Sequence, residues 1–394
     1  MPTTPTSLSV QRHRLHLLGA LASVGGLGLV ACSSPPTASP SAKASSSVPS
    51  TPPATNPIVM KSASERPFTG GSVTGSYSRR PEVMAQVPEM AKRLQLPEEY
   101  VRYAIGNGNF LSQVPRLVLP SKAGSGHRNW RVYRSRFIDN VRIQAGVQFW
   151  RENAEALARA ERTYGVPAKY IVGIVGVETI YGRNTGNLRV IDTLTTLAFD
   201  FPQEHPRAQQ RNAFFRGELE SYLQLTWNNN DDPLSLRGSY AGAMGLPQFM
   251  PSSWQKHAVD FDGDGHIDLF GSPTDVVGSV AHYFQQYGWV PGLEPEFEVT
   301  FDQSRLQLPT LLEPDIRTTF TKEQFAALGA IAHNIPAGFN GKLALIELEN
   351  GYAPSTYFAG TDNFYVITRY NNSSYYAQSV IDLANEVSRA MVRR

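Results

Sequence analysis

Residues 167–182 read PAKYIVGIVGVETIYG, an apolar segment with one carboxylate near its end. Proline is favoured at the start of a helix and glycine just past its end, so this segment predicts a buried helix with Glu178 in its last turn. Burial and the negative end of the helix dipole both disfavour a charged carboxylate. We therefore expect a raised pKa at Glu178, as general-acid cleavage of a glycosidic bond requires. Helix position alone leaves open a structural glutamate paired with Arg183 or Arg189.

The sequence around this helix predicts a mainly α-helical protein with a small β-rich part, an α+β fold. Apolar residues recur at helical spacing from about residue 81 to 288, and residues 145–164 predict one amphipathic helix closed by Gly165. Segments 297–301, 343–348 and 356–367 have the alternation or the β-branched and aromatic content of strands, and 375–392 returns to helical spacing. We expect a helical catalytic region at 81–290, a β-rich subdomain at 291–366, and a segment at 367–394 that packs on the helical region.

The first 80 residues predict a leader and a tether. Arg12 and Arg14 precede an apolar stretch at 15–30, and the lone cysteine, Cys32, follows at once. The segment 29–32, LVAC, resembles a lipobox, which implies cleavage of residues 1–31 and a lipid on Cys32. The alternative is an uncleaved membrane helix, although the apolar run is shorter than the roughly 20 residues that a span needs.

Residues 33–57 are nearly all Ser, Pro, Thr or Ala, and such a composition stays extended, so we expect a tether over 32–80. Serine directly after the cysteine indicates an outer-membrane lipoprotein that faces the periplasm.

Charge and aromatic content limit the partners. The chain has 36 Lys and Arg against 34 Asp and Glu, so it lacks the basic excess that nucleic-acid binding requires. A polysaccharide fits better, since 17 Tyr and 5 Trp can offer ring faces and polar edges to sugars.

Residues 260–268 read DFDGDGHID, the first half of an EF-hand loop. Oxygen ligands alternate, and a glycine follows for the sharp turn. Gly271 occupies the twelfth position, where an EF-hand places a glutamate. An empty acidic turn is the alternative to a calcium site.

Several separated blocks resemble the membrane-bound lytic murein transglycosylase B family. They are GVETIYGR at 176–183, DTL at 192–194, TLAF at 196–199, AGAMG at 241–245, QFMPS at 248–252 and ITRYN at 367–371, and the resemblance covers roughly residue 130 to the C-terminus. It implies a lysozyme-like core in which Glu178 acts first as acid and then as base on the bond between N-acetylmuramic acid and N-acetylglucosamine. The C6 hydroxyl of the muramic acid then attacks C1 and leaves a 1,6-anhydro end, assisted by the 2-acetamido group, so no second carboxylate and no catalytic cofactor are needed.

The resemblance also implies the remaining site residues and partners. For each expected substrate contact, the alternative is a residue that only packs in the core. Arg207 is a weak match to an arginine pair that binds the peptide in this family. The expected substrate contacts are Ser239, Gln248, Tyr283, Tyr370, Asn371, Tyr376 and Tyr133. The expected calcium ligands are Asp260, Asp262, Asp264, the His266 carbonyl and Asp275, in a structural site. The implied partners are peptidoglycan glycan strands, the membrane through Cys32, and cell-wall synthesis or division proteins.

Two rival functions stay open. One is a cell-wall-binding lipoprotein with an inactive lysozyme-like fold. The other is a true lysozyme, which needs a second carboxylate opposite Glu178. Asp192 and Glu218 are among the nearest acidic residues in sequence, and neither lies in a motif that suggests this role.

Overall fold

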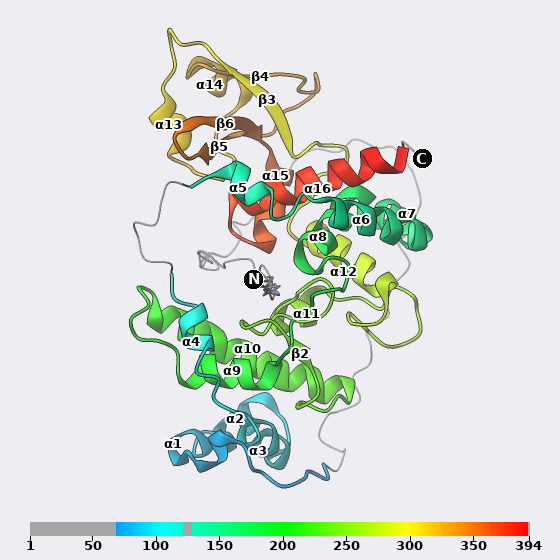
Figure 1. The fold of residues 1–394 in the computed structure, drawn as a ribbon, viewed down its shortest axis with the longest axis vertical. Helices are drawn as coiled ribbons and strands as arrows, with labels where there is room; N and C mark the ends of the chain where they lie inside the picture. Colours follow the sequence, from blue (N-terminus) through cyan, green and yellow to red (C-terminus); the bar gives the residue numbers. More distant parts are fainter. Residues whose placement is uncertain (1–67, 121–127, 393–394) are drawn as a thin grey trace, which may run out of the picture.

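A computed structural model describes residues 68–120 and 128–392. The fold is mainly helical with a two-stranded and a four-stranded sheet, as the prediction of a mainly α-helical protein with a small β-rich part requires (Figure 1). Cys32 and the leader lie outside the described residues. Among the described helices, none combines the length and the apolar character that crossing a bilayer requires.

The N-terminal helices form one end of the molecule, drawn in blue in Figure 1. They are η2 Ser76–Arg79, α1 Pro81–Met84, α2 Val87–Leu94 and α3 Glu98–Gly106. The next helix, α4 Val114–Leu117, is drawn in cyan and lies nearer the middle of the molecule. The packed chain begins before residue 81, because Tyr77 is fully buried and donates a hydrogen bond to Asp200. Residues from Tyr77 onward therefore belong to the packed chain, although the tether was predicted to extend to residue 80.

The helical catalytic region fills the middle of the molecule. Its elements are α5 Trp130–Arg134, α6 Asn140–Glu152, α7 Ala154–Tyr164, α8 Ala168–Thr179, β1 Leu188–Arg189, α9 Val190–Phe199, α10 Ala208–Asn229, β2 Arg237–Gly238, α11 Pro251–His257 and α12 Pro273–Gln286. The single helix predicted over 145–164 is wrong. It breaks at Asn153, whose side-chain amide donates to the Phe149 carbonyl at 2.8 Å and competes with the helix ladder. Gly165 closes α7 as predicted, with φ +71°.

The small subdomain lies at the opposite end from the blue helices (Figure 1). Its elements are β3 Glu296–Phe301, α13 Leu308–Leu312, α14 Lys322–Ala327, β4 Ala330–Ala332, β5 Ala344–Asn350 and β6 Ala353–Gly360. The strands form one antiparallel sheet in the order β4-β3-β6-β5, with Ile346 opposite Phe358 in the β5–β6 hairpin. The sheet covers its own apolar cluster, separate from the large core of the helices.

The last two helices bring the chain back to the catalytic region. They are α15 Asp362–Tyr370 and α16 Ser374–Val392. The strand-like content of 356–367 predicted a strand to its end, but β6 stops at Gly360 because the Thr361 side chain caps α15 by accepting from the Asn363 N–H at 3.2 Å. The helix predicted over 375–392 is confirmed as α16, which packs along α8 and α6.

Candidate active site around Glu178

Glu178 lies one residue before the end of α8, as its apolar sequence predicts. The helix ends at Thr179, three residues earlier than the glycine that was expected to mark its end. Ile180 and Tyr181 continue the chain with φ of 53° and 57°, and Gly182 follows with φ 88°. The chain therefore reverses immediately after the carboxylate.

The Glu178 carboxyl has one polar partner among the described residues. The Tyr376 hydroxyl, at the start of α16, donates a hydrogen bond to Glu178 Oε1. Glu178 keeps part of its surface accessible to solvent although its carboxyl lies deep in the protein. Burial raises the pKa of Glu178 to about 7, and the Tyr376 hydrogen bond partly opposes that rise. A carboxyl with this pKa can give up a proton and take one back near neutral pH.

The alternative of a salt-bridged structural glutamate does not hold. Arg189 instead binds Asp192, with Nη2 at 2.7 Å from Oδ1, and no described arginine forms an ion pair with Glu178.

A buried threonine joins the end of α8 to the glycine-rich loop at 241–245. Thr179 Oγ1 donates to the Leu246 carbonyl at 2.9 Å and accepts from the Gly182 N–H at 3.0 Å. The loop itself is held by Ser239, whose hydroxyl accepts from the Ala243 N–H at 3.0 Å. Ser239 is buried, so its hydroxyl shapes the loop beside the Glu178 helix.

Four of the tyrosines singled out in the sequence gather around Glu178. Burial raises the pKa of each, and the Glu178 carboxylate contributes to the rise at Tyr133, Tyr283, Tyr370 and Tyr376, so its charge reaches all four hydroxyls. For Tyr133 the pKa rises to about 12. The site is thus a carboxyl surrounded by phenol groups.

These tyrosines differ in what they expose. Tyr376 and Tyr283 are 1% and 5% exposed, so their rings offer little face to a ligand. Tyr370 and Tyr133 are half-buried. Tyr370 donates to the Pro247 carbonyl at 2.6 Å, and Tyr283 donates to the Arg369 carbonyl at 2.7 Å.

The remaining predicted contacts lie outside the helices, and one of them, Asn371, directly follows Tyr370. Gln248 has φ 51°, and its Nε2 donates to the carbonyls of Thr185 and Gly245, both at 3.0 Å. Asn371 is the half-buried residue at the end of α15. Arg207 directly precedes α10, and no described contact joins it to Glu178.

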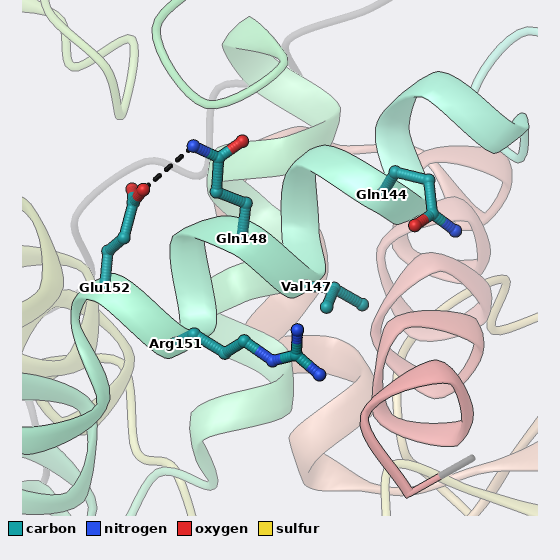
Figure 2. Close-up of a pocket in the computed structure, with 5 residues that line it drawn as sticks. All are labelled: Gln144, Val147, Gln148, Arg151 and Glu152. Carbon is teal, nitrogen blue, oxygen red and sulfur yellow. Dashed lines mark hydrogen bonds between the residues drawn. The ribbon is translucent and has the colours of Figure 1, made fainter. Parts of the chain in front are cut away.

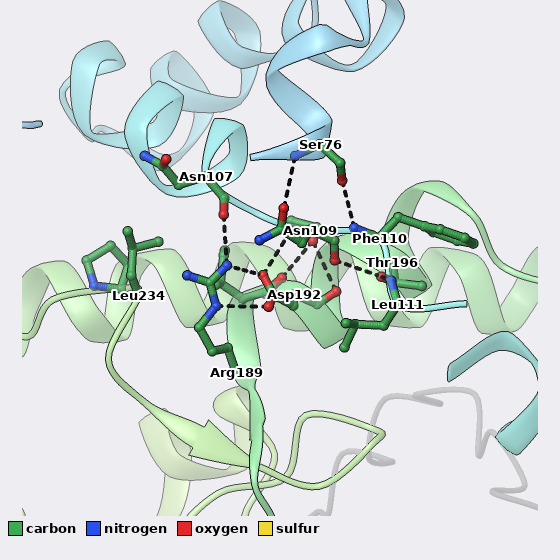
Figure 3. Close-up of polar contacts among 12 residues, drawn as sticks. Ser76, Asn107, Asn109, Phe110, Leu111, Arg189, Asp192, Thr196 and Leu234 are labelled. Atoms are coloured by element: carbon green, nitrogen blue, oxygen red, sulfur yellow. Dashed lines mark hydrogen bonds and ion pairs between the residues drawn. The ribbon is translucent and has the colours of Figure 1, made fainter. Parts of the chain in front are cut away.

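The two acidic residues considered as a second catalytic carboxylate have structural partners. Figure 3 shows that Asp192 binds Arg189 and accepts from the Asn109 N–H at 2.8 Å, which ties the N-terminal helices to α9. Glu218 accepts from the Ser252 hydroxyl at 2.6 Å and from the Ser252 N–H at 2.9 Å. Neither is available as a nucleophile.

The acidic loop at 260–268 gathers three carboxylates. One oxygen each of Asp260, Asp262 and Asp264 lies within 4.8 Å of the others. Two oxygens bound to one Ca²⁺ are at most about 5 Å apart, so this set fits a calcium ion.

Asp275, the remaining predicted carboxylate ligand, lies against the same loop. It is buried, one oxygen accepts from the Phe261 N–H at 2.7 Å, and the other accepts from the Asp268 N–H at 2.9 Å. These hydrogen bonds hold the loop backbone beside the group of three carboxylates. His266 is exposed, and its N–H donates to Asp264 at 2.8 Å.

One hollow on the surface of α6 contains none of these residues. It measures about 390 Å³ and is lined only by α6 residues, Gln144, Val147, Gln148, Arg151 and Glu152 (Figure 2). One helix face without converging polar groups from other elements does not form a ligand site. The chemistry therefore points to Glu178 and not to the hollow on α6.

Two residues of the site escaped the sequence analysis. Thr179 was quoted only as part of a motif, and its tie to Leu246 spans 67 residues. Tyr375, next to Tyr376, meets the ring of Tyr133 edge-on at 5.5 Å between centroids. The sequence offered one signal for Thr179, which is that a polar residue ends an apolar helix. The same signal applies equally to Glu178.

Comparison with known proteins identifies relatives over most of the chain. Residues 79–385 match the model of the transglycosylase SLT domain. The membrane-bound lytic murein transglycosylase B of Escherichia coli (strain K12) is 38% identical over 328 residues, which are 81% of this chain and 86% of that protein.

Solved structures agree with this match. The soluble lytic transglycosylase SltB1 from Pseudomonas aeruginosa is 42% identical with a TM-score of 0.70, over 79% of this chain and 99% of that chain. The Escherichia coli lytic transglycosylase Slt35, solved in complex with calcium, is 37% identical with a TM-score of 0.70, over 81% of this chain and 96% of that chain.

Proposed function

The chain belongs to the transglycosylase SLT domain family and is a peptidoglycan lytic transglycosylase, and from this premise we propose that Glu178 is its acid and base. The observation that carries the proposal is the Glu178 carboxyl itself. It is largely buried, bound by one tyrosine hydroxyl and free of any described arginine, with a pKa of about 7.

The hydrogen bond from Tyr376 assigns the two carboxyl oxygens different tasks. Oε1 accepts from Tyr376, so the proton of the neutral acid belongs on Oε2. From there it moves to the oxygen that links C1 of N-acetylmuramic acid to N-acetylglucosamine, and the C1–O bond breaks. The 2-acetamido oxygen assists by bonding to C1.

The second half of the reaction returns the proton. The Glu178 carboxylate removes the proton of the C6 hydroxyl, O6 bonds to C1 and displaces the acetamido oxygen, and a 1,6-anhydro end results. Glu178 is then neutral again, and no water is consumed. Because the substrate supplies the nucleophile, the structural roles of Asp192 and Glu218 are compatible with catalysis.

The other predicted contacts divide into two groups. We propose that half-buried Tyr133, Tyr370, Gln248 and Asn371 meet the sugar chain, whereas buried Ser239, Tyr283 and Tyr376 hold the site in shape. We also propose the domain boundaries predicted from the sequence, except that the packed chain begins before residue 81.

The acidic loop is proposed to hold a structural Ca²⁺. Asp260, Asp262 and Asp264 would supply carboxylate oxygens, and His266 would supply its carbonyl. Asp275, which binds the Phe261 and Asp268 N–H groups of the same loop, is proposed as the remaining ligand. The calcium complex of Slt35 supports this assignment.

Anchoring to the outer membrane is proposed from the sequence. Cys32 would carry the lipid, and residues after it would reach toward the glycan strands from the periplasmic face. The membrane-bound relative of Escherichia coli supports a membrane association.

The proposal is tested by mass spectrometry of the muropeptides that the full chain, purified in mild detergent, releases from sacculi. We expect ends with 1,6-anhydromuramic acid from the wild type and from Glu298→Gln, an exposed control on β3, and a loss of at least about a thousandfold with Glu178→Gln. Reducing ends would indicate a hydrolase instead. Binding to sacculi without any product would indicate the inactive wall-binding protein.

A further inference from the structure

The turn after Glu178 has a backbone that its residues do not favour. Ile180 and Tyr181 both adopt left-handed conformations, with φ 53° and 57°. Such values are uncommon for residues other than glycine, and β-branched residues such as Ile180 are outliers there. A strained pair persists only where its surroundings hold it in place.

The side chain of Tyr181 reaches a notch between two helices. A methyl group added to Gly146 on α6 or to Gly176 on α8 would come within 2.4 Å of the Tyr181 hydroxyl oxygen in either case. The ring of Phe149, also on α6, lies 5.3 Å from the Tyr181 ring. Each helix thus carries a glycine where the tip of Tyr181 enters.

A third helix meets the other two at the same point. The methyl on Gly146 would also come within 2.6 Å of Val387 Cγ2, and the methyl on Gly176 within 2.7 Å of Leu383 Cδ2. Val387 and Leu383 belong to α16, the helix whose first turn carries Tyr376. The separation of α8 and α16 decides whether the Tyr376 hydroxyl reaches Glu178.

The Tyr181 side chain contributes through packing and not through a hydrogen bond of its hydroxyl. It is buried and has no hydrogen-bond partner among the described residues, which is an unfavourable position for a polar group. Burial raises the pKa of Tyr181, so the phenol stays neutral. The contribution of Tyr181 is therefore its packing between Gly146 and Gly176.

We propose that Tyr181 is a positioning residue of the transglycosylase reaction. Its packing fixes the relative positions of α6, α8 and α16 and stabilises the left-handed turn. The Glu178 carboxyl and the Tyr376 hydroxyl are thereby held at hydrogen-bond distance. Tyr181 does not touch the substrate. The inference rests on the proposed role of Glu178.

The first test removes the ring from the full chain, purified in mild detergent. With a soluble tetrasaccharide of alternating N-acetylglucosamine and N-acetylmuramic acid, Tyr181→Ala lowers kcat by about tenfold or more, because small misplacements of a catalytic group are costly. KM changes by less than about twofold, since no substrate contact is lost. The basic limb of the pH profile moves to higher pH, because Glu178 loses the Tyr376 donation that lowers its pKa. Tyr181→Phe, which keeps the ring, recovers most of the loss.

The second test fills the notch from the other side. Gly176→Ala pushes on the tip of Tyr181 and lowers kcat. Adding Tyr181→Phe restores only a small part of it, because the oxygen at 2.4 Å is gone while the ring carbon Cζ at 2.7 Å stays. Gly173→Ala is the matched control on α8. Its methyl would meet the Val380 carbonyl at 2.7 Å and is not near Tyr181, so Tyr181→Phe does not rescue it. Gly217→Ala, with open space around its added methyl, behaves as the wild type.

Two results would overturn the inference. One is a Tyr181→Ala variant with a lowered melting temperature but an unchanged kcat and pH profile, which would make Tyr181 a packing residue only. The other is a Gly176→Ala variant that keeps the kcat of the wild type, although its methyl presses on Tyr181. An active Glu178→Gln variant would instead overturn the proposed function and this inference with it, so the two failures are distinguishable.

Discussion

At the scale of single residues, Glu178 owes its chemistry to two opposing effects. Burial at the end of an apolar helix raises its pKa to about 7, and the hydroxyl of Tyr376 stabilises the charged form and limits that rise. The first effect keeps a proton available for the leaving oxygen. The second effect keeps a carboxylate accessible for the later removal of the C6 proton.

Removing the Tyr376 hydroxyl separates these effects. Tyr376→Phe raises the pKa of Glu178 further, because the carboxylate loses its hydrogen bond and the neutral acid does not need one. We expect the basic limb of the profile of kcat/KM against pH to move upward. We also expect kcat at neutral pH to fall by roughly tenfold to a hundredfold, because the carboxylate is less well held. A basic limb that stays in place would contradict the assignment.

The sequence could predict Glu178 but not Tyr376's role. The carboxylate is identified by its position on an apolar helix, which is a local signal. The hydrogen bond joins residues 198 positions apart, and no pattern of spacing encodes it. The family blocks marked Tyr376 as a contact with sugar, whereas its 1% exposure favours an orienting role.

At the scale of elements, the most informative junction joins the small subdomain to α16. Glu296 on β3 accepts from Gln378 Nε2 at 3.2 Å, and the same amide donates to Asp382 at 3.1 Å. Asp382 also binds Arg134 of α5. Burial raises the pKa of Glu296 to about 7, and the Gln378 hydrogen bond opposes the rise.

This junction makes stability depend on pH. The folded-state pKa of Glu296 lies above its unfolded value of about 4.5, so the folded chain binds more protons between these values. Its contribution to stability is present below about pH 4.5, falls as pH rises toward 7, and stays low above that. Glu296→Gln removes the cost of ionisation and should stabilise the protein at pH 8 by about 1–3 kcal/mol.

Thermal unfolding at two pH values measures this effect. At pH 4 the variant and the wild type should melt at nearly the same temperature, because position 296 is then mostly neutral in both the folded and the unfolded chain. Glu298→Gln on the exposed face of β3 controls for the loss of a charge on the same strand. A Glu296→Gln variant that is less stable at pH 8 would show that the carboxylate is needed in its charged form.

Helix and strand ends show where sequence analysis fails. The apolar spacing predicted the helices around α8 and the strands β3 and β5, because burial of one face decides both. The break at Asn153 and the end of β6 at Thr361 depend on single side chains that bind nearby backbone groups. Such contacts compete with the main pattern over one or two residues and leave its periodicity almost intact.

At the scale of the whole molecule, catalysis depends on parts far apart in the chain. The end of α8, the loop at 241–245 and the start of α16 converge on Glu178. The acidic loop lies between α11 and α12, and α12 carries Tyr283 and packs on α7 and α8. A cation in this loop would therefore stabilise the same assembly of helices.

Calcium should raise the melting temperature of the full chain. A ligand present at a hundredfold excess over its Kd stabilises the folded state by about 2.7 kcal/mol, which corresponds to roughly 3–4 °C for a chain of this size. The Asp262→Asn variant should lose most of this shift, because Asp262 belongs to the carboxylate group. Glu313→Gln, an exposed control outside the loop, should keep it. Equal shifts with magnesium would argue against a dedicated calcium site.

The central claim is that the substrate's own C6 hydroxyl, activated by Glu178, completes the reaction in place of water. Digestion of sacculi in water enriched in oxygen-18, followed by mass spectrometry of the released muropeptides, tests it directly. We predict 1,6-anhydromuramic ends that are lighter than hydrolysed ends by one water and carry no oxygen-18. Oxygen-18 at C1 of a reducing muramic acid would contradict the account, because water would then be the nucleophile.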